Sequence, residues 1–146
     1  MRDLAVLPDG KVLLAADVVL TGPGNQKTSV MLLKQLTAAG ALDAAFGVAG
    51  TAEFPGRSAV VDVMTVQPDG KILLMGAKYP YPDEATLVRF LDDGTVDSGF
   101  GTSGLVVFPT IAGGPNPRGM LVKVLPDGKL QVYGRTGDSV NQDRLL

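Results

Sequence analysis

The sequence repeats one five-residue phrase three times, at intervals of about 60 residues. It reads LPDGK at Leu7–Lys11, QPDGK at Gln67–Lys71 and LPDGK again at Leu125–Lys129. A regular period of this length is typical of repeat architectures, in which each repeat forms one small structural unit that stacks on its neighbours. The chain is therefore expected to fold as similar units placed in series.

Each copy of PDG has the residues of a tight turn. Pro8 sets φ for the second position of a type I turn, Asp9 tolerates the third, and Gly10 takes the left-handed conformation that closes the turn. Apolar runs flank this turn at Leu4–Leu7 and Val12–Ala16. Two apolar runs joined by such a turn predict a β-hairpin.

A second glycine-ended turn and a fourth apolar run complete each unit. The turn reads TAAG in the first unit and DDG in the second. One unit therefore reads as four short antiparallel strands joined by turns. The predicted third and fourth strands are Ser29–Leu36 and Thr51–Phe54 in the first unit, and Ala85–Leu91 and Leu105–Phe108 in the second.

The apolar residues of these strands are often consecutive, as in KVLLAADVVL and KILLMGA. A sheet that is covered on both faces has this pattern, whereas a sheet with one wet face alternates. Four-stranded sheets stacked face to face are the blades of a β-propeller. We predict an all-β fold of antiparallel blades, about two and a half per chain, with units at residues 1–57, 58–117 and 118–146. Phe46 and Phe100 are expected to fill the gaps between blades.

The repeat resembles that of a known family. The run FLDDGTVDSGFGTSGLVV of the second unit is similar to the bacterial delta-60 repeat, and the first unit has the weaker form AAGALDAAFG. The resemblance implies a propeller-type repeat scaffold, usually part of larger and often exported proteins. It therefore implies an extracellular or cell-surface location. It supplies no catalytic residues.

Composition argues against several kinds of function. The chain has no Cys and no His, which removes disulfides, thiolate or imidazole metal sites and any Ser-His-Asp triad. The net charge is −2 without a basic stripe, so nucleic-acid binding has no electrostatic support. No apolar run approaches the roughly 18 residues of a membrane span, and the first residues do not form a signal peptide. We predict no cofactor.

Two and a half blades cannot close a ring. The first and last blades should each leave an apolar face bare, and neither end of the chain is polar enough to cap it. We expect that several copies complete the ring as a homo-oligomer, or that missing sequence does so. A strand from another chain could complete the last, partial blade by β-addition.

The variable links between second and third strands are candidate binding loops, because a scaffold repeats and a binding loop need not. All three are expected on one rim of the ring: Thr21–Ser29, Lys78–Glu84 and Arg135–Gln142. The middle link combines aromatic rings with carboxylates, a chemistry that recognises sugars or peptides. Its predicted ligand-binding residues are Tyr79, Tyr81, Asp83 and Glu84.

Carboxylates elsewhere have simpler interpretations. The PDG aspartates suit turn geometry, and Asp43 and Asp97 are expected to accept Asx-type hydrogen bonds that hold the following turn. Asp92, Asp93 and Asp97 supply the hard oxygens that Ca²⁺ requires, but no calcium-loop spacing is present, so they are weak metal candidates. Nothing singles out an acid and a nucleophile for a glycosidase.

We therefore predict a protein without catalytic residues. It is expected to be a propeller scaffold that self-associates and binds glycan or protein through its rim loops. One alternative is a glycoside hydrolase or lyase with carboxylates in the central channel. Another is an excised or engineered fragment whose only activity is self-assembly.

Overall fold

The computed structural model describes residues 1–55, 59–78, 84–109, 118–135 and 143–145. Within these residues the regular secondary structure is β-strand apart from a single 3-10 turn at Pro23–Asn25, and there is no α-helix. The described part contains no helix that is long and apolar enough to cross a membrane. The predicted all-β class is confirmed.

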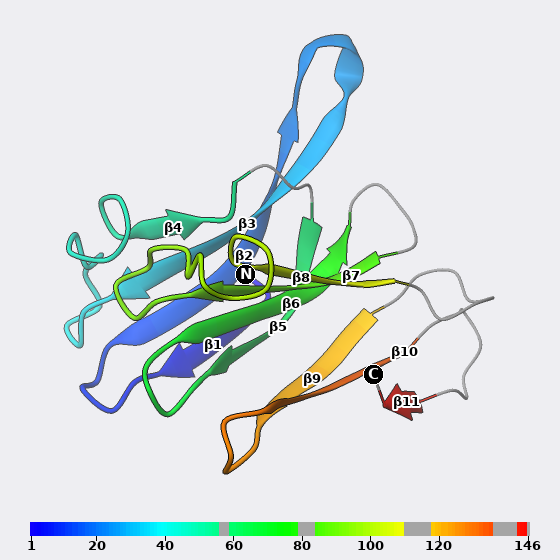
Figure 1. Ribbon diagram of the computed structural model, residues 1–146. Helices are drawn as coiled ribbons and strands as arrows, with labels where there is room; N and C mark the ends of the chain where they lie inside the picture. Colours follow the sequence, from blue (N-terminus) through cyan, green and yellow to red (C-terminus); the bar gives the residue numbers. More distant parts are fainter. Residues whose placement is uncertain (56–58, 79–83, 110–117, 136–142, 146) are drawn as a thin grey trace.

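Eleven strands form three antiparallel sheets, each built from consecutive strands (Figure 1). The first sheet has the order β1 (Asp3–Val6), β2 (Val12–Thr21), β3 (Lys27–Leu36), β4 (Thr51–Glu53). The second has the order β5 (Ala59–Val66), β6 (Ile72–Lys78), β7 (Glu84–Phe90), β8 (Leu105–Pro109). The third has the order β11 (Asp143–Leu145), β10 (Leu130–Arg135), β9 (Arg118–Val124).

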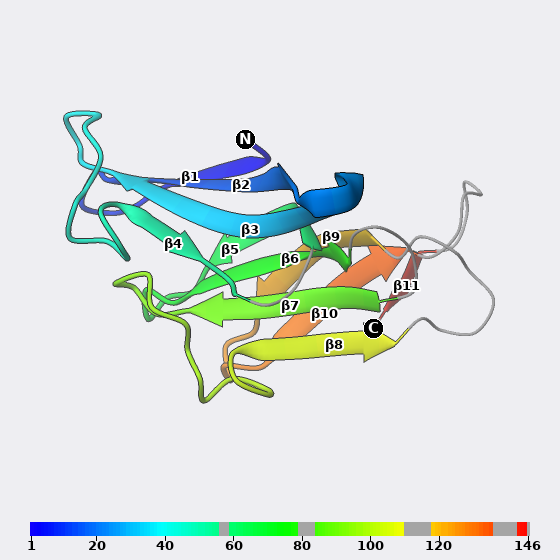
Figure 2. The same ribbon diagram turned by 90° about the horizontal axis from the view of Figure 1, so that it is seen from above.

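The three sheets lie as successive layers in chain order (Figure 2). Four-stranded antiparallel sheets stacked in this way are consistent with partial propeller blades, and in the described residues they do not close a ring. The third sheet has one strand, β11, that the sequence did not predict. The predicted unit boundaries after residues 57 and 117 fall in segments outside the described residues, so they stay predictions.

Two hydrophobic cores fill the spaces between the layers. The first core lies between the first and second sheets, and its fully buried members include Leu13, Leu33, Ile72, Leu74 and Val88. The second core lies between the second and third sheets and contains Leu73, Met75, Leu87, Val122 and Val132. The second sheet is therefore covered on both faces, as its consecutive apolar residues predicted.

The PDG turns have the predicted geometry. In the first, Leu7 N donates to Lys11 O over 2.8 Å, and Gly10 has φ of +83°. The Asp9 carboxylate accepts from Lys11 N at 3.1 Å. The corresponding glycines of the other two turns have φ of +85° and +80°, so all three hairpins close in the same way.

The two repeated phenylalanines do lie between sheets, but to different degrees. Phe46 is 1% exposed and belongs to the first core. The next residue, Gly47, donates its N–H to Asp93 O at 2.7 Å and so joins the first unit to the second. Phe100 is only half-buried against the second core, and Arg89 lies over its ring at 4.2 Å.

One expected rim loop is shorter than predicted. The link Thr21–Ser29 was predicted to be a loop, but β2 continues to Thr21 and β3 begins at Lys27. The β2–β3 hairpin therefore projects beyond the sheet (Figure 1), and only a five-residue turn, residues 22–26, remains. The β-branched residues on either side, such as Val18, Thr28 and Val30, favour strand, and the two runs pair with each other and extend the ladder.

Candidate functional site

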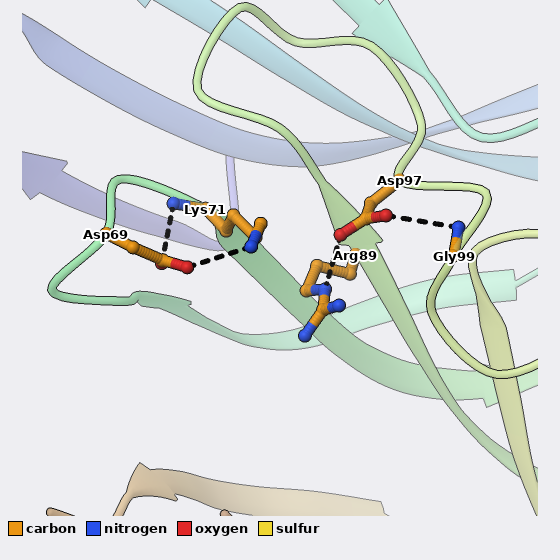
Figure 3. Close-up of polar contacts among 5 residues, drawn as sticks. All are labelled: Asp69, Lys71, Arg89, Asp97 and Gly99. Atoms are coloured by element: carbon orange, nitrogen blue, oxygen red, sulfur yellow. Dashed lines mark hydrogen bonds and ion pairs between the residues drawn. The ribbon is translucent and has the colours of Figure 1, made fainter. Parts of the chain in front are cut away.

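Of the three carboxylates proposed as weak metal ligands, Asp93 and Asp97 accept hydrogen bonds from nearby groups, and Asp92 lines a groove between the first two sheets. Asp93 accepts from both the backbone N and the hydroxyl of Thr95, at 2.8 and 2.7 Å, and the hydroxyl lowers the pKa of that carboxyl below its usual value. Asp97 pairs with Arg89 Nε at 2.9 Å and accepts from Gly99 N at 3.1 Å (Figure 3). In the described residues no group of three potential ligands is placed to hold a metal ion.

Asp43 and Asp97 occupy the same position in two units and make the predicted Asx-type bond. Asp43 accepts from Ala45 N at 3.1 Å, as Asp97 does from Gly99 N. The counter-cations differ, because Asp43 pairs with Lys11 at 2.9 Å and Asp97 pairs with Arg89. The Lys11 ammonium lowers the pKa of Asp43, followed in effect by the Ala45 N–H.

The PDG aspartates also have partners close in sequence. Asp69 pairs with Lys71 at 2.9 Å (Figure 3), and Asp127 pairs with Lys129 at 2.8 Å. In both cases the lysine lowers the pKa of the carboxyl. Such exposed pairs contribute little stability, so their main role is to hold the turn.

Of the four residues predicted to form the rim site, only Glu84 lies within the described residues. Tyr79, Tyr81 and Asp83 lie outside the described residues, while Glu84 is the partly buried first residue of β7. Their role in binding stays a prediction.

A shallow groove of about 510 Å³ lies between the hairpin ends of the first and second sheets. Its walls are mainly apolar and include Leu7, Pro8, Pro68 and Ile72. Gln67 is 8% exposed there, and its Oε1 has no hydrogen-bond partner in the described residues. The groove can hold a small apolar group, and the carboxylates of Asp9 and Asp92 also line it.

The most distinctive surface is the outer face of the first sheet. Strand pairing places Leu4 beside Leu14 and Val6 beside Val12, with all four side chains on the face that points away from the second sheet. The same face continues along the projecting β2–β3 hairpin. We call this surface the bare face and define it by its aliphatic residues Leu4, Val6, Val12, Leu14, Val18 and Leu20.

Exposure on the two sides of the first sheet is asymmetric along β1 and the first half of β2, whereas Leu32 of β3, on the same side as Leu14, is 8% exposed. On the bare face, Val6 is 69% exposed and Leu4 is 50% exposed. On the opposite face, Leu13 and Ala15 are fully buried against the second sheet. Two exposed charged residues share this face, Lys34 of β3, which pairs with Leu14, and Glu53 of the edge strand β4.

An aliphatic centre with a charged border is the composition of a protein–protein interface. A contiguous exposed apolar surface on a folded chain marks a site of interaction. The sequence predicted a bare apolar face at this end of the stack. It could not predict the residues, because both faces of β2 are apolar and only the register tells them apart.

The outer face of the third sheet differs from the expectation. It was predicted to be apolar, but β9 presents the exposed Lys123 next to Leu121, which is 48% exposed. The neighbouring β10 adds Gln131 and Tyr133, both partly buried. The two outward faces of the stack are therefore chemically different.

Comparison with known proteins supports the architecture and leaves the activity open. A family model described as a domain of unknown function (DUF5122) beta-propeller matches residues 67–100. This match covers the second PDGK phrase through Phe100 and supports a propeller-type repeat, without bearing on the delta-60 repeat in particular. None of the curated proteins and none of the solved structures matches the chain.

Proposed function

We propose that this chain is a non-enzymatic β-propeller scaffold that self-associates and binds glycan or protein through its rim loops. The observation that carries the proposal is the bare face, because an aliphatic surface of this kind in water favours contact with another apolar surface. The propeller-type family match agrees with a scaffold built from stacked blades.

The carboxylates support a structural role over a catalytic one. Asp43, Asp93 and Asp97 each accept a backbone hydrogen bond from the residue two positions later. Catalytic carboxyls of glycosidases stand free on either side of a bond to be cleaved, with one of them in an environment that raises its pKa. The pKa values of Asp43 and Asp93 are shifted the other way.

Self-association is tested by measuring the mass of the native protein over a range of concentrations. We expect species at whole multiples of the 15.1 kDa chain. Val6→Lys places a charge on the bare face and should shift the distribution toward the single chain. Val48→Lys is the matched control, because Val48 is 83% exposed and lies outside the bare face. A single chain at all concentrations contradicts the proposal.

Ligand binding through the rim is tested with glycan and peptide arrays. We expect binding by the wild type that is lost in the Tyr79→Ala, Tyr81→Ala double variant while the far-UV circular dichroism spectrum is unchanged. A wild type that binds nothing on either array contradicts this part of the proposal. Glycoside turnover that disappears on changing Asp92 and Asp93 to Asn contradicts the non-enzymatic part.

A further inference from the structure

One position of the repeat is buried in the second and third sheets but exposed on the bare face. Leu4, Met64 and Val122 each lie four residues before the proline of their PDG turn, in the first strand of their sheet. Met64 is 8% exposed within the first core, and Val122 is 3% exposed within the second. Leu4 is 50% exposed, because none of the sheets in the described residues packs on its side of the first sheet.

The two interfaces between sheets within the chain have the same orientation, in which each sheet uses corresponding residues to contact the next. The residues of the first sheet that contribute to the first core include Leu13 and Ala15, three and five residues after the glycine of the PDG turn. In the second sheet the same two positions are Leu73 and Met75, and they belong to the second core. Each sheet therefore presents one particular face to its successor and the opposite face to its predecessor.

The third sheet presents the corresponding outward positions. Gln131 and Tyr133 occupy the places of Leu73 and Met75, and Leu121 lies beside them on β9. All three are at least partly accessible. They join apolar surface to hydrogen-bonding groups, so they can cover an aliphatic sheet while remaining compatible with water.

We propose that the outward face of the third sheet of one copy packs on the bare face of a second copy, in the same head-to-tail sense as the sheets within the chain. This inference rests on the proposed self-association and specifies its surfaces. Leu121, Gln131 and Tyr133 of one copy then cover Leu4 and Leu14 of the next.

A polar contact supports the same alignment. Thr65 Oγ1 of the second sheet donates to Val122 O of the third at 3.0 Å. The position of Thr65 is filled in the third sheet by Lys123, and the position of Val122 is filled in the first sheet by Leu4. In the head-to-tail arrangement Lys123 Nζ is therefore placed to donate to the Leu4 carbonyl of the next copy.

The head-to-tail sense of the contact also determines what kind of assembly forms. A head-to-tail contact leaves the same two surfaces free at the ends, so it continues until a ring closes, or into an open filament if the rotation between copies does not close. Each chain supplies three sheets, so two copies supply six, which is within the roughly four to eight blades of propellers. A contact between two bare faces would instead stop at a pair of copies related by a two-fold axis.

Cysteine cross-linking separates these arrangements, because the chain has no cysteine of its own. Leu4→Cys and Leu121→Cys variants, one carrying a mass tag, are mixed under mild oxidation. Both positions are about half exposed, so the substitutions should be tolerated. We expect disulfide-linked pairs that contain one variant of each kind. A mixture of Leu4→Cys with Val48→Cys measures the background from random collision.

The outcomes distinguish failure of the inference from failure of the proposed function. Cross-linking of Leu4→Cys to itself, or none above background in a protein whose native mass exceeds one chain, overturns the head-to-tail contact and leaves self-association standing. A native mass of one chain at all concentrations overturns both. Leu4→Lys provides a second measurement without cysteine, and we expect self-association to weaken about tenfold or more. Unchanged association of that folded variant also overturns the inference.

Discussion

Because Met64 is buried and Leu4 is half exposed, truncating each to alanine should lower the free energy of unfolding by very different amounts. Met64→Ala removes a side chain that is 8% exposed and lies between two sheets. Truncating a buried methionine to alanine typically lowers the free energy of unfolding by about 2–5 kcal/mol. Leu4 fills the same place in the repeat but is 50% exposed. Since complete burial of a leucine side chain contributes about 1.5–3 kcal/mol, Leu4→Ala should cost about half of that, about 0.8–1.5 kcal/mol, in a single chain.

These costs are measured by urea unfolding followed by far-UV circular dichroism, since the chain has no tryptophan. With a slope of about 1–3 kcal/mol/M, Met64→Ala should lower the unfolding midpoint by about 1 M or more. Leu4→Ala should shift the midpoint far less at concentrations where the wild type is a single chain. Equal losses from Met64→Ala and Leu4→Ala under those conditions would refute the reasoning, because they would mean that the chain covers its own first sheet.

Protein concentration supplies an internal control for this comparison. If a second copy covers the bare face, association stabilises the folded wild type by mass action. The cost of Leu4→Ala should then increase with concentration, whereas the cost of Met64→Ala should stay nearly constant. A Leu4→Ala cost that does not change with concentration, in a protein shown to associate, would place the contact elsewhere.

Two further predictions follow from single residues. Gly76→Ala should destabilise the fold strongly, because the added Cβ would lie 1.8 Å from Val60 O, whereas Gly99→Ala meets no contact closer than 3.4 Å and should cost much less in the same unfolding assay. The pKa of Asp43 is lowered in the folded state by Lys11 and by the Ala45 N–H, so the unfolded state binds more protons as the pH falls through the range below about 4. The stability that Asp43 provides should therefore be present at neutral pH and lost on acidification, and the difference between wild type and Asp43→Asn should shrink as unfolding is measured from pH 6 down to pH 3.

Local features of the fold could be predicted well because they depend on a few adjacent residues. The PDG turn needs Pro, Asp and a glycine with positive φ, and Gly10 has φ of +83°. The Asx-type bonds of Asp43 and Asp97 depend on spacing of the same short range. Phe46 could be predicted to lie between sheets because a phenylalanine recurs at the corresponding position of the second unit, Phe100.

Features that depend on partner strands could not be predicted. The Gly-Pro-Gly cluster after Thr21 suggested a wide loop, but cross-strand pairing such as Val18 with Val30 extends the hairpin. The short strand β11 has too few residues to give a pattern. The register shift between Val61 and Val63 in β5 also leaves no clear sign in the sequence, because it depends on how β5 pairs with β6.

Hydrogen bonds next to that register shift help to hold the first and second sheets in one alignment. Contact between aliphatic faces has no direction and would allow two sheets to slide over each other. Next to the shift, the N–H of Met64 donates to the Asp3 carboxylate at 2.9 Å, and Val61 N donates to Asp17 at 3.4 Å. Asp17 is in turn held by Arg2 at 2.6 Å. The first sheet thus supplies hydrogen-bond acceptors to β5, the first strand of the second sheet. Burial of apolar side chains provides the attraction between the sheets, and these bonds set their alignment. Any sheet that covers the bare face needs both kinds of contact, which is why a mixed surface such as that of the third sheet suits it better than a purely aliphatic one.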